Sequence, residues 1–206
     1  KDPKHKFLGV RMAAIFDLAK QFMEMPIGEI EKLIGCEYYE ARMGAVSIMD
    51  FQARNKKTTP LRKKELFDLY IKCHDKIDNW DLVDRSAPYV VGGYLFDKPR
   101  DILYKLAKSD HVWERRTAIV STYFFIRQND LSDTFRIAEV LINDEHDLIQ
   151  KAVGSWVREA GKRDELVLIE FLDNYAHSMP MTMLRCAIEK LDPKEKRYYL
   201  EINKKK

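Results

Sequence analysis

The feature that most constrains this chain is a spacing of about 35 residues between similar segments. Basic residues stand near the starts of alternate predicted helices at Arg42, Arg116, Lys151 and Arg185, at separations of 74, 35 and 34 residues. The first separation spans two periods, and the position it skips falls at about residue 79. Such a period is typical of helix pairs that stack side by side and bury their apolar faces between neighbours. The sequence therefore predicts an all-α superhelix or solenoid, with the second helix of each pair lining one concave surface.

Apolar periodicity locates the individual helices. The chain has only 8 glycines and 7 prolines, most of them between apolar-periodic segments, which indicates many helices joined by short turns. No strand-like alternation persists for long. The predicted helices cover residues 11–23, 27–34, 38–54, 60–76, 79–95 with a break near Pro88, 98–108, 111–128, 131–142, 147–163, 164–174, 180–191 and 193–202.

Length and composition favour a soluble protein of one domain. The 206 residues, 46% of them hydrophobic, suffice for a substantial core, so we expect residues 1–206 to form a single repeat domain. The apolar runs are far shorter than the roughly 20 residues of a membrane span, and no signal-peptide pattern opens the chain. Cys36, Cys73 and Cys186 lack paired spacing, and the five histidines are dispersed. We expect a cytoplasmic protein without a disulfide framework, a metal site or a membrane partner.

The net charge of +3 permits nucleic-acid binding but does not establish it, so the placement of the charges decides. One predicted helix carries Lys151, Ser155, Arg158 and Lys162 at offsets of 0, 4, 7 and 11 residues, which is one face of a helix. The alternatives are a solvated face and, for single basic residues of the repeat register, helix caps or pairs with Glu40, Glu114 and Glu189. Taken together, the set favours a basic groove that contacts a phosphate backbone.

The segment Asn79-Trp80-Asp81-Leu82-Val83-Asp84 occupies the skipped position of the register. Trp80 and Asp84 are four residues apart and share a helix face, which sets an aromatic ring beside a carboxylate. Such a pair can hold a cation, although Trp80 alone could also be a packing aromatic. The alternatives for Asp81 are to cap the helix or to pair with Lys76 or Arg85.

Several spaced motifs give the chain a family resemblance. They are the segment of Trp80 and Asp84, Trp113-Glu114-Arg115-Arg116, Ile149-Gln150-Lys151-Ala152-Val153-Gly154, Lys6-Phe7-Leu8-Gly9-Val10-Arg11, Arg158-Glu159-Ala160-Gly161-Lys162-Arg163, and Thr182-Met183-Leu184-Arg185 with Ala187-Ile188-Glu189. In their order and separation they resemble the AlkD-like DNA alkylation-repair glycosylases, a bacterial family built from HEAT-like helical repeats. The resemblance covers nearly the whole chain.

The resemblance implies hydrolysis of the N-glycosidic bond of cationic N3- or N7-alkylated purines in double-stranded DNA, without a metal or organic cofactor. It assigns catalytic or lesion-contacting roles to Trp80, Asp84 and Arg116, with Asp84 stabilising an oxocarbenium-like sugar and aligning water. DNA contact is expected from Arg11, Lys151, Ser155, Arg158, Lys162 and Arg185. We expect a monomer without an obligate protein partner, acting in the bacterial cytoplasm and on the nucleoid.

The chain departs from the family at three places. Ser155 follows Gly154 where the family has a tryptophan facing the lesion, and Trp156, one residue later, points about 100° away on a helix. Met181 stands where the family commonly has arginine, and we expect the N-terminal helix of relatives to be shortened or missing before Phe7. Two further hypotheses therefore stand beside the glycosylase: a repeat protein that binds bent or damaged DNA without cleaving it, and a protein-binding scaffold.

Overall fold

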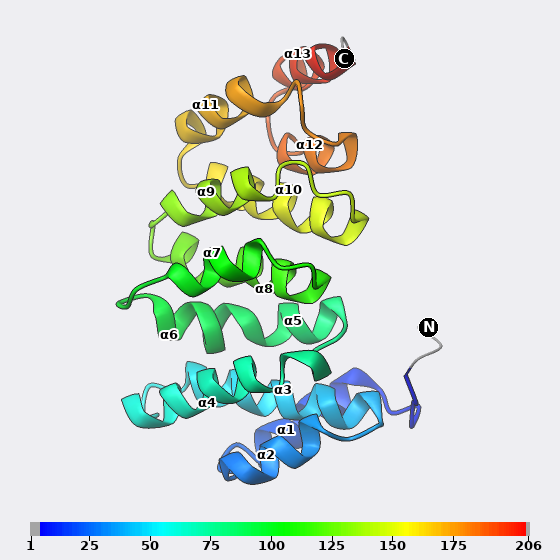
Figure 1. Cartoon of the computed structure of the whole chain (residues 1–206), viewed down its shortest axis with the longest axis vertical. Helices are drawn as coiled ribbons and strands as arrows, with labels where there is room; N and C mark the ends of the chain where they lie inside the picture. Colours follow the sequence, from blue (N-terminus) through cyan, green and yellow to red (C-terminus); the bar gives the residue numbers. More distant parts are fainter. Residues whose placement is uncertain (1–4, 205–206) are drawn as a thin grey trace. The chain divides into compact units, whose positions relative to one another are not determined.

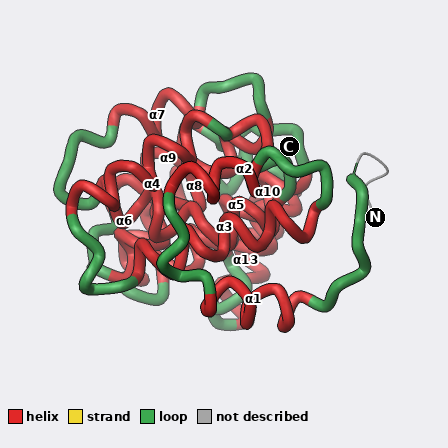
Figure 2. Tube along the Cα trace, turned by 90° about the horizontal axis from the view of Figure 1, so that it is seen from below, coloured by secondary structure: helices red, strands yellow, loops and turns green. Residues whose placement is uncertain are grey.

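The computed structural model describes residues 5–204, which are helical over most of their length. Figure 2 shows these helices in red, joined by loops in green. Within this range the single sheet-like pairing is a bridge between Lys6 and Tyr38. None of the described helices is both long enough and apolar enough to span a membrane. The prediction of an all-α fold is confirmed.

The chain divides into two compact units, Lys1–Lys98 and Pro99–Lys206. Each contains its own buried apolar side chains, among them Ile30, Met49 and Tyr70 in the first and Phe125 and Ile137 in the second. That residues 1–206 act as a single domain stays a prediction.

The first unit is centred on one long helix, α3 (Tyr39–Arg54), which packs against its neighbours on both sides. The other helices of this unit are α1 (Met12–Gln21), α2 (Ile27–Ile34), α4 (Pro60–Lys72), α5 (Trp80–Ala87) and the short α6 (Gly93–Leu95), and Figure 1 draws them in blue to green. A 3-10 turn, His74–Lys76, precedes α5. Both α1 and α5 contact α3, so α3 connects the N-terminal segment to the helix of Trp80 and Asp84.

The helical run that starts with α5 continues past Pro88, where a break was predicted. Pro88 has helical dihedral angles (φ −54°, ψ −45°), and a π-helical turn, Pro88–Gly92, leads directly into α6. A proline lacks the N–H of the normal helical hydrogen bond and its ring crowds the preceding turn. A wider π turn relieves this crowding without ending the helix.

The second unit consists of stacked helix pairs. Its helices are α7 (Asp101–Ala107), α8 (Val112–Arg127), α9 (Ser132–Val140), α10 (Asp147–Gly161), α11 (Glu165–Tyr175), α12 (Met181–Ala187) and α13 (Pro193–Lys204), drawn in green to red in Figure 1. The first helices α7 and α9 contact each other, and the second helices contact in the order α8, α10, α12. This is the helix-pair stacking that the 35-residue spacing predicts.

Helices α10 and α12 approach each other closely at Gly154. A Cβ atom on this residue would lie 2.3 Å from the carbonyl oxygen of Met183 and 2.6 Å from the Cβ of Cys186. Only glycine fits between the two backbones at this distance. Gly154 therefore sets the distance between two helices that carry predicted DNA contacts.

Candidate functional site

The start of α5 presents the predicted aromatic and carboxylate side chains. The side-chain oxygen of Asn79 accepts a hydrogen bond from the Trp80 N–H at 2.8 Å, and α5 begins at Trp80. The Trp80 side chain is 48% exposed, and Asp84, one turn later, is half-buried. A helix thus places an exposed indole and a carboxylate on neighbouring turns, as the spacing predicts.

Asp81 fastens the first turn of α5 to α3. The Tyr39 hydroxyl donates a hydrogen bond to Oδ2 of Asp81, and Oδ1 accepts the Leu82 N–H at 2.9 Å. Burial, and then the bond to this carboxylate, raise the pKa of Tyr39, so its hydroxyl stays a proton donor.

The predicted pairing of Asp81 with Lys76 or Arg85 is wrong. Lys76 pairs with Asp75, and Arg85 with Asp50. Lys76 and Arg85 are near Asp81 in the sequence, whereas Tyr39 comes from 42 residues earlier.

Arg42 fixes the segment that leads into α5. Its side chain is almost fully buried, and Nη1 donates to the carbonyl oxygen of Lys76 at 3.1 Å and to Oδ1 of Asp78 at 2.6 Å. His5 Nε2 lies 3.1 Å from the other oxygen of Asp78. Arg42 is therefore a structural brace, positioned where the repeat register predicted a basic residue.

Glu40 binds the N-terminal segment, so the alternative pair of Glu40 with Arg42 is wrong. Its carboxylate accepts the N–H groups of Leu8 at 2.9 Å and Gly9 at 2.8 Å. Burial by itself raises the pKa of Glu40, but these backbone hydrogen bonds oppose it, and the net shift is downward. Arg11, just beyond this segment, is exposed, and its side chain has no partner among residues 5–204.

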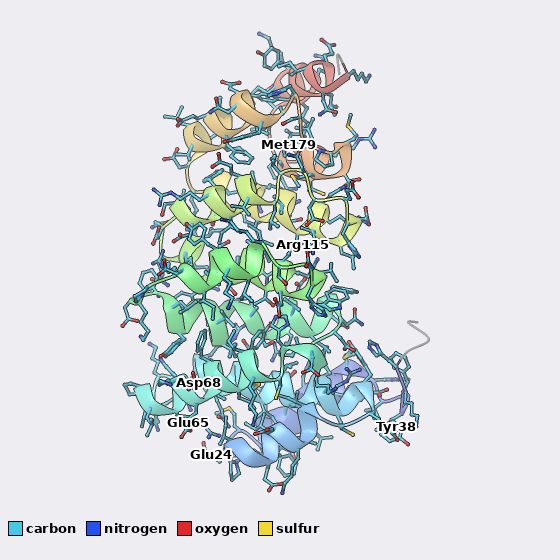
Figure 3. The ribbon with its side chains drawn as sticks, viewed as in Figure 1. Glu24, Tyr38, Glu65, Asp68, Arg115 and Met179 are labelled. Atoms are coloured by element: carbon cyan, nitrogen blue, oxygen red, sulfur yellow. The ribbon has the colours of Figure 1, made fainter. Side chains whose placement is uncertain are left out.

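In the second unit, Arg116 is buried rather than displayed. Its side chain is only 7% exposed, and Nη1 donates to the Leu148 carbonyl oxygen at 2.6 Å, in the first turn of α10. Its neighbour Arg115, labelled in Figure 3, lies with Nε 2.6 Å from Oδ2 of Asp144. The two arginines brace the loop and the start of α10. Because Asp84 belongs to the other unit, an Arg116–Asp84 contact stays a prediction.

The face of α10 predicted to be basic has the expected exposure. Lys151 and Lys162 are exposed and Ser155 and Arg158 half-buried, whereas Ala152, Val153 and Val157 on the other side are buried. Trp156 is half-buried and stacks on Tyr123, with ring centres 5.0 Å apart and planes 24° apart. The one tryptophan near Ser155 in sequence is therefore used in packing.

This face is less basic than predicted, because each cation has a carboxylate partner. Lys151 pairs with Asp147 and Lys162 with Glu159, both at 2.6 Å. Arg158, whose side chain is 18% exposed, contacts Glu159 and Glu189. The spacing of the four polar residues correctly predicted which face of α10 they share. It gave no information on the acidic residues of the adjacent turn and of the loop after α12. Arg185 on α12 is exposed and has no side-chain partner within the described part of the chain.

Sequence reasoning missed the residues that hold α5 in place. Tyr39 and His5 reach Asp81 and Asp78 across 42 and 73 residues, and no short motif connects them. These contacts form only when the chain has folded and α3 packs against α5, so the sequence alone does not indicate them.

The fold and these side chains define an all-α helical-repeat protein with an exposed indole near a carboxylate. Buried arginines brace the segment before α5 and the start of α10. Residues 2–191 match the family model described as "DNA alkylation repair enzyme". The chain belongs to this family, and membership supports an enzymatic role in the repair of alkylated DNA. A solved structure, a predicted DNA alkylation repair enzyme from Enterococcus faecalis, has the same fold, with a TM-score of 0.74 at 16% identity over 92% of this chain and 90% of that chain. A search of curated proteins finds no match.

Proposed function

We propose that the protein is a monofunctional DNA glycosylase that removes cationic N3- or N7-alkylated purines from double-stranded DNA. The observation that carries this proposal is the pair formed by exposed Trp80 and half-buried Asp84 at the anchored start of α5. Family membership supplies the substrate class, alkylated DNA.

The chemistry suits a cationic leaving group. When the bond between C1′ and the purine nitrogen breaks, its electron pair stays with the base and neutralises the positive charge, so no general acid has to protonate the base. The sugar becomes oxocarbenium-like, a water oxygen bonds to C1′, and the water proton passes to a base or to solvent. Asp84 would stabilise the positive sugar and accept or direct that proton.

Trp80 would contact the positive base or sugar through its ring. An exposed indole can contribute roughly 0.5 to 2 kcal/mol to holding a cation. The hydrogen bonds from the Trp80 N–H to Asn79 and from the Tyr39 hydroxyl to Asp81 support this role, because they fix the helix turn that carries the indole.

The proposed DNA contacts differ in whether the side chain must first leave an ion pair. Arg11 and Arg185 have no side-chain partner among the described residues and could bind phosphate directly. Lys151, Arg158 and Lys162 would exchange a carboxylate for a phosphate, and Ser155 could donate a hydrogen bond from the same face. Arg116, which is buried, would act by holding α10 in position. We further propose that the protein acts as a monomer, without a cofactor, in the bacterial cytoplasm.

The test is release of free base from duplex DNA that contains N7-methylguanine or N3-methyladenine. Asp84→Asn should lower the single-turnover rate by about 10² to 10³, the scale of one lost electrostatic contact in a transition state. Asp17→Asn is the matched control, because it changes a carboxylate on α1 that forms only an exposed pair with Lys20. Equal rates for Asp84→Asn and the wild type would overturn the assignment of Asp84.

One observation favours a second candidate, a relative that binds damaged DNA without cleaving it. Ser155 supplies no ring at the position after Gly154, and Trp156 is engaged with Tyr123. This candidate expects salt-sensitive binding of the alkylated duplex with no base released by the wild type.

A further inference from the structure

A buried carboxylate in the first unit binds two arginines. The Asp50 side chain on α3 is completely buried, and both of its oxygens lie 2.8 Å from Nε of Arg54. Nη2 of Arg85 on α5 lies 3.3 Å from Oδ2 of Asp50. Two cations and one carboxylate leave this group with excess positive charge.

The Arg85 side chain packs against neighbouring side chains of the first unit. Its guanidinium carbon lies 4.8 Å from the ring centre of Phe16 and 4.7 Å from that of Phe51, and Nε donates to Oγ of Ser47 at 3.2 Å. With two arginines against one carboxylate, the group keeps one net positive charge. Arg54 is the more exposed of its two cations, since its side chain is 44% exposed and that of Arg85 is 21% exposed.

Arg54 is exposed and held in one orientation. Its side chain is 44% exposed, and its guanidinium carbon lies 3.7 Å above the centre of the Tyr89 ring. Stacking on Tyr89 and the bond from Nε to Asp50 fix the guanidinium plane, and neither Nη group has a partner in the described part of the chain. A planar fork with free Nη groups matches a phosphate, which binds arginine in a bidentate manner.

The position of this fork relates to the proposed site on α5. Along α5 and the π turn, the partly exposed residues are Trp80, Asp81, Asp84, Arg85 and Tyr89, separated by buried residues. Tyr89 comes five residues after Asp84, which on a helix is a rise of about 7 Å and a turn of about 140° around the axis, so the fork lies to one side of the Asp84 carboxylate. Lys56 and Lys57, just beyond α3, are also exposed and pair with no described carboxylate.

We propose that Arg54, oriented by Asp50 and Tyr89, binds a phosphate of the DNA backbone. This inference rests on the proposed function for its ligand, DNA. It adds a phosphate contact in the first unit, near the chemistry, to the contacts expected from the helix starts.

The test is the salt dependence of binding to alkylated duplex DNA, followed by fluorescence anisotropy from about 50 to 200 mM salt. Loss of one phosphate contact in Arg54→Ala should reduce the slope of log K against log salt by about 0.9 and weaken binding about tenfold at low salt. Arg54→Lys keeps the charge but not the fork, and Tyr89→Leu removes the stacking, so both should weaken binding with the slope unchanged. Lys64→Ala is the matched control, because Lys64 already pairs with Asp68 on α4. Asp68 and its neighbour Glu65 are labelled in Figure 3. This variant should bind DNA as the wild type does.

Thermal melts show whether each variant is folded. If Arg54→Ala does not fold, the affinities of Arg54→Lys and Tyr89→Leu test the proposed contact. A folded Arg54→Ala with the wild-type slope, or Arg54→Lys and Tyr89→Leu with wild-type affinity, overturns the inference, as does a wild type without affinity for DNA. Base release is measured on the same samples. If the wild type releases no base but the Arg54 variants change the slope as expected, the glycosylase proposal fails and the phosphate contact stands.

Discussion

Gly154→Ala tests the close contact between α10 and α12. The added Cβ would meet the backbone of Met183 at 2.3 Å, whereas ordinary contacts of this kind begin at 3.4 Å. The two helices must therefore separate by about 1 Å. A backbone oxygen cannot rotate aside as a flexible side chain can, so the strain falls on the packing of the whole interface.

The expected cost follows from two opposing terms. Overpacking of a tight interior costs about 1–3 kcal/mol, and a clash with backbone belongs at the upper end of that range. Alanine in place of glycine favours the helix by about 0.5–1 kcal/mol. The net loss is about 2 kcal/mol, which in a chain of this length lowers Tm by about 4–8 °C.

Thermal unfolding measured by circular dichroism and calorimetry provides the assay. Gly28→Ala is the matched control, because Gly28 lies in α2 and its added Cβ would meet nothing within 4 Å. That variant should be as stable as the wild type or slightly more stable. If Gly154→Ala melts at or above the wild-type temperature, the contact between α10 and α12 is not as close as we describe.

Three further predictions separate structural from functional side chains. Trp80→Ala should change stability by no more than about 0.5 kcal/mol, because the ring is exposed, while base release falls sharply; a large loss in Tm would identify Trp80 as a packing residue. Arg116→Met leaves the Leu148 carbonyl without its donor and should cost about 1–3 kcal/mol in urea unfolding, whereas Arg185→Met, at an exposed site, should cost little; equal effects would contradict the brace. The lowered pKa of Glu40 stabilises the folded state above the unfolded-state value of 4.5, and this contribution is lost as pH falls through the folded-state pKa. The unfolding free energy of Glu40→Gln, about 1–2 kcal/mol below that of the wild type near pH 7, should therefore approach it in acid, and parallel pH profiles would refute the argument.

The helices could be predicted from the sequence because their signals are local. Apolar periodicity and the positions of glycine and proline reproduce the observed helix ends to within four residues. The changes of type are the 3-10 turn His74–Lys76 and the π turn at Pro88. The relation of Trp80 to Asp84 is equally local, since it depends only on four residues within one helix. Periodicity of this kind also located the polar face of α10.

The contacts that decide the roles of charged residues could not be predicted in the same way. Arg158 meets Glu189 across 31 residues and Arg42 meets Asp78 across 36, so their pairing depends on how separate helices pack. A register of basic residues predicts the positions but does not distinguish Arg42, which is buried, from Arg185, which is exposed. The distinction arises because a buried arginine must find acceptors, and the carbonyl oxygens of Lys76 and Leu148 provide them for Arg42 and Arg116.

Because residue 155 is a serine, the proposed aromatic contact to the base depends on Trp80 of α5. Gly154 cannot accept a side chain, Ser155 has no ring, and Trp156 is stacked on Tyr123. Recognition of a cationic base would then depend on Trp80, whose position is set within the first unit by the Tyr39–Asp81 bond. Tyr39→Phe removes that hydrogen bond and keeps the aromatic ring of residue 39. If Trp80 works by position, this variant should lower base release more than it lowers affinity for undamaged DNA, whereas equal losses would mean that the bond only stabilises the fold.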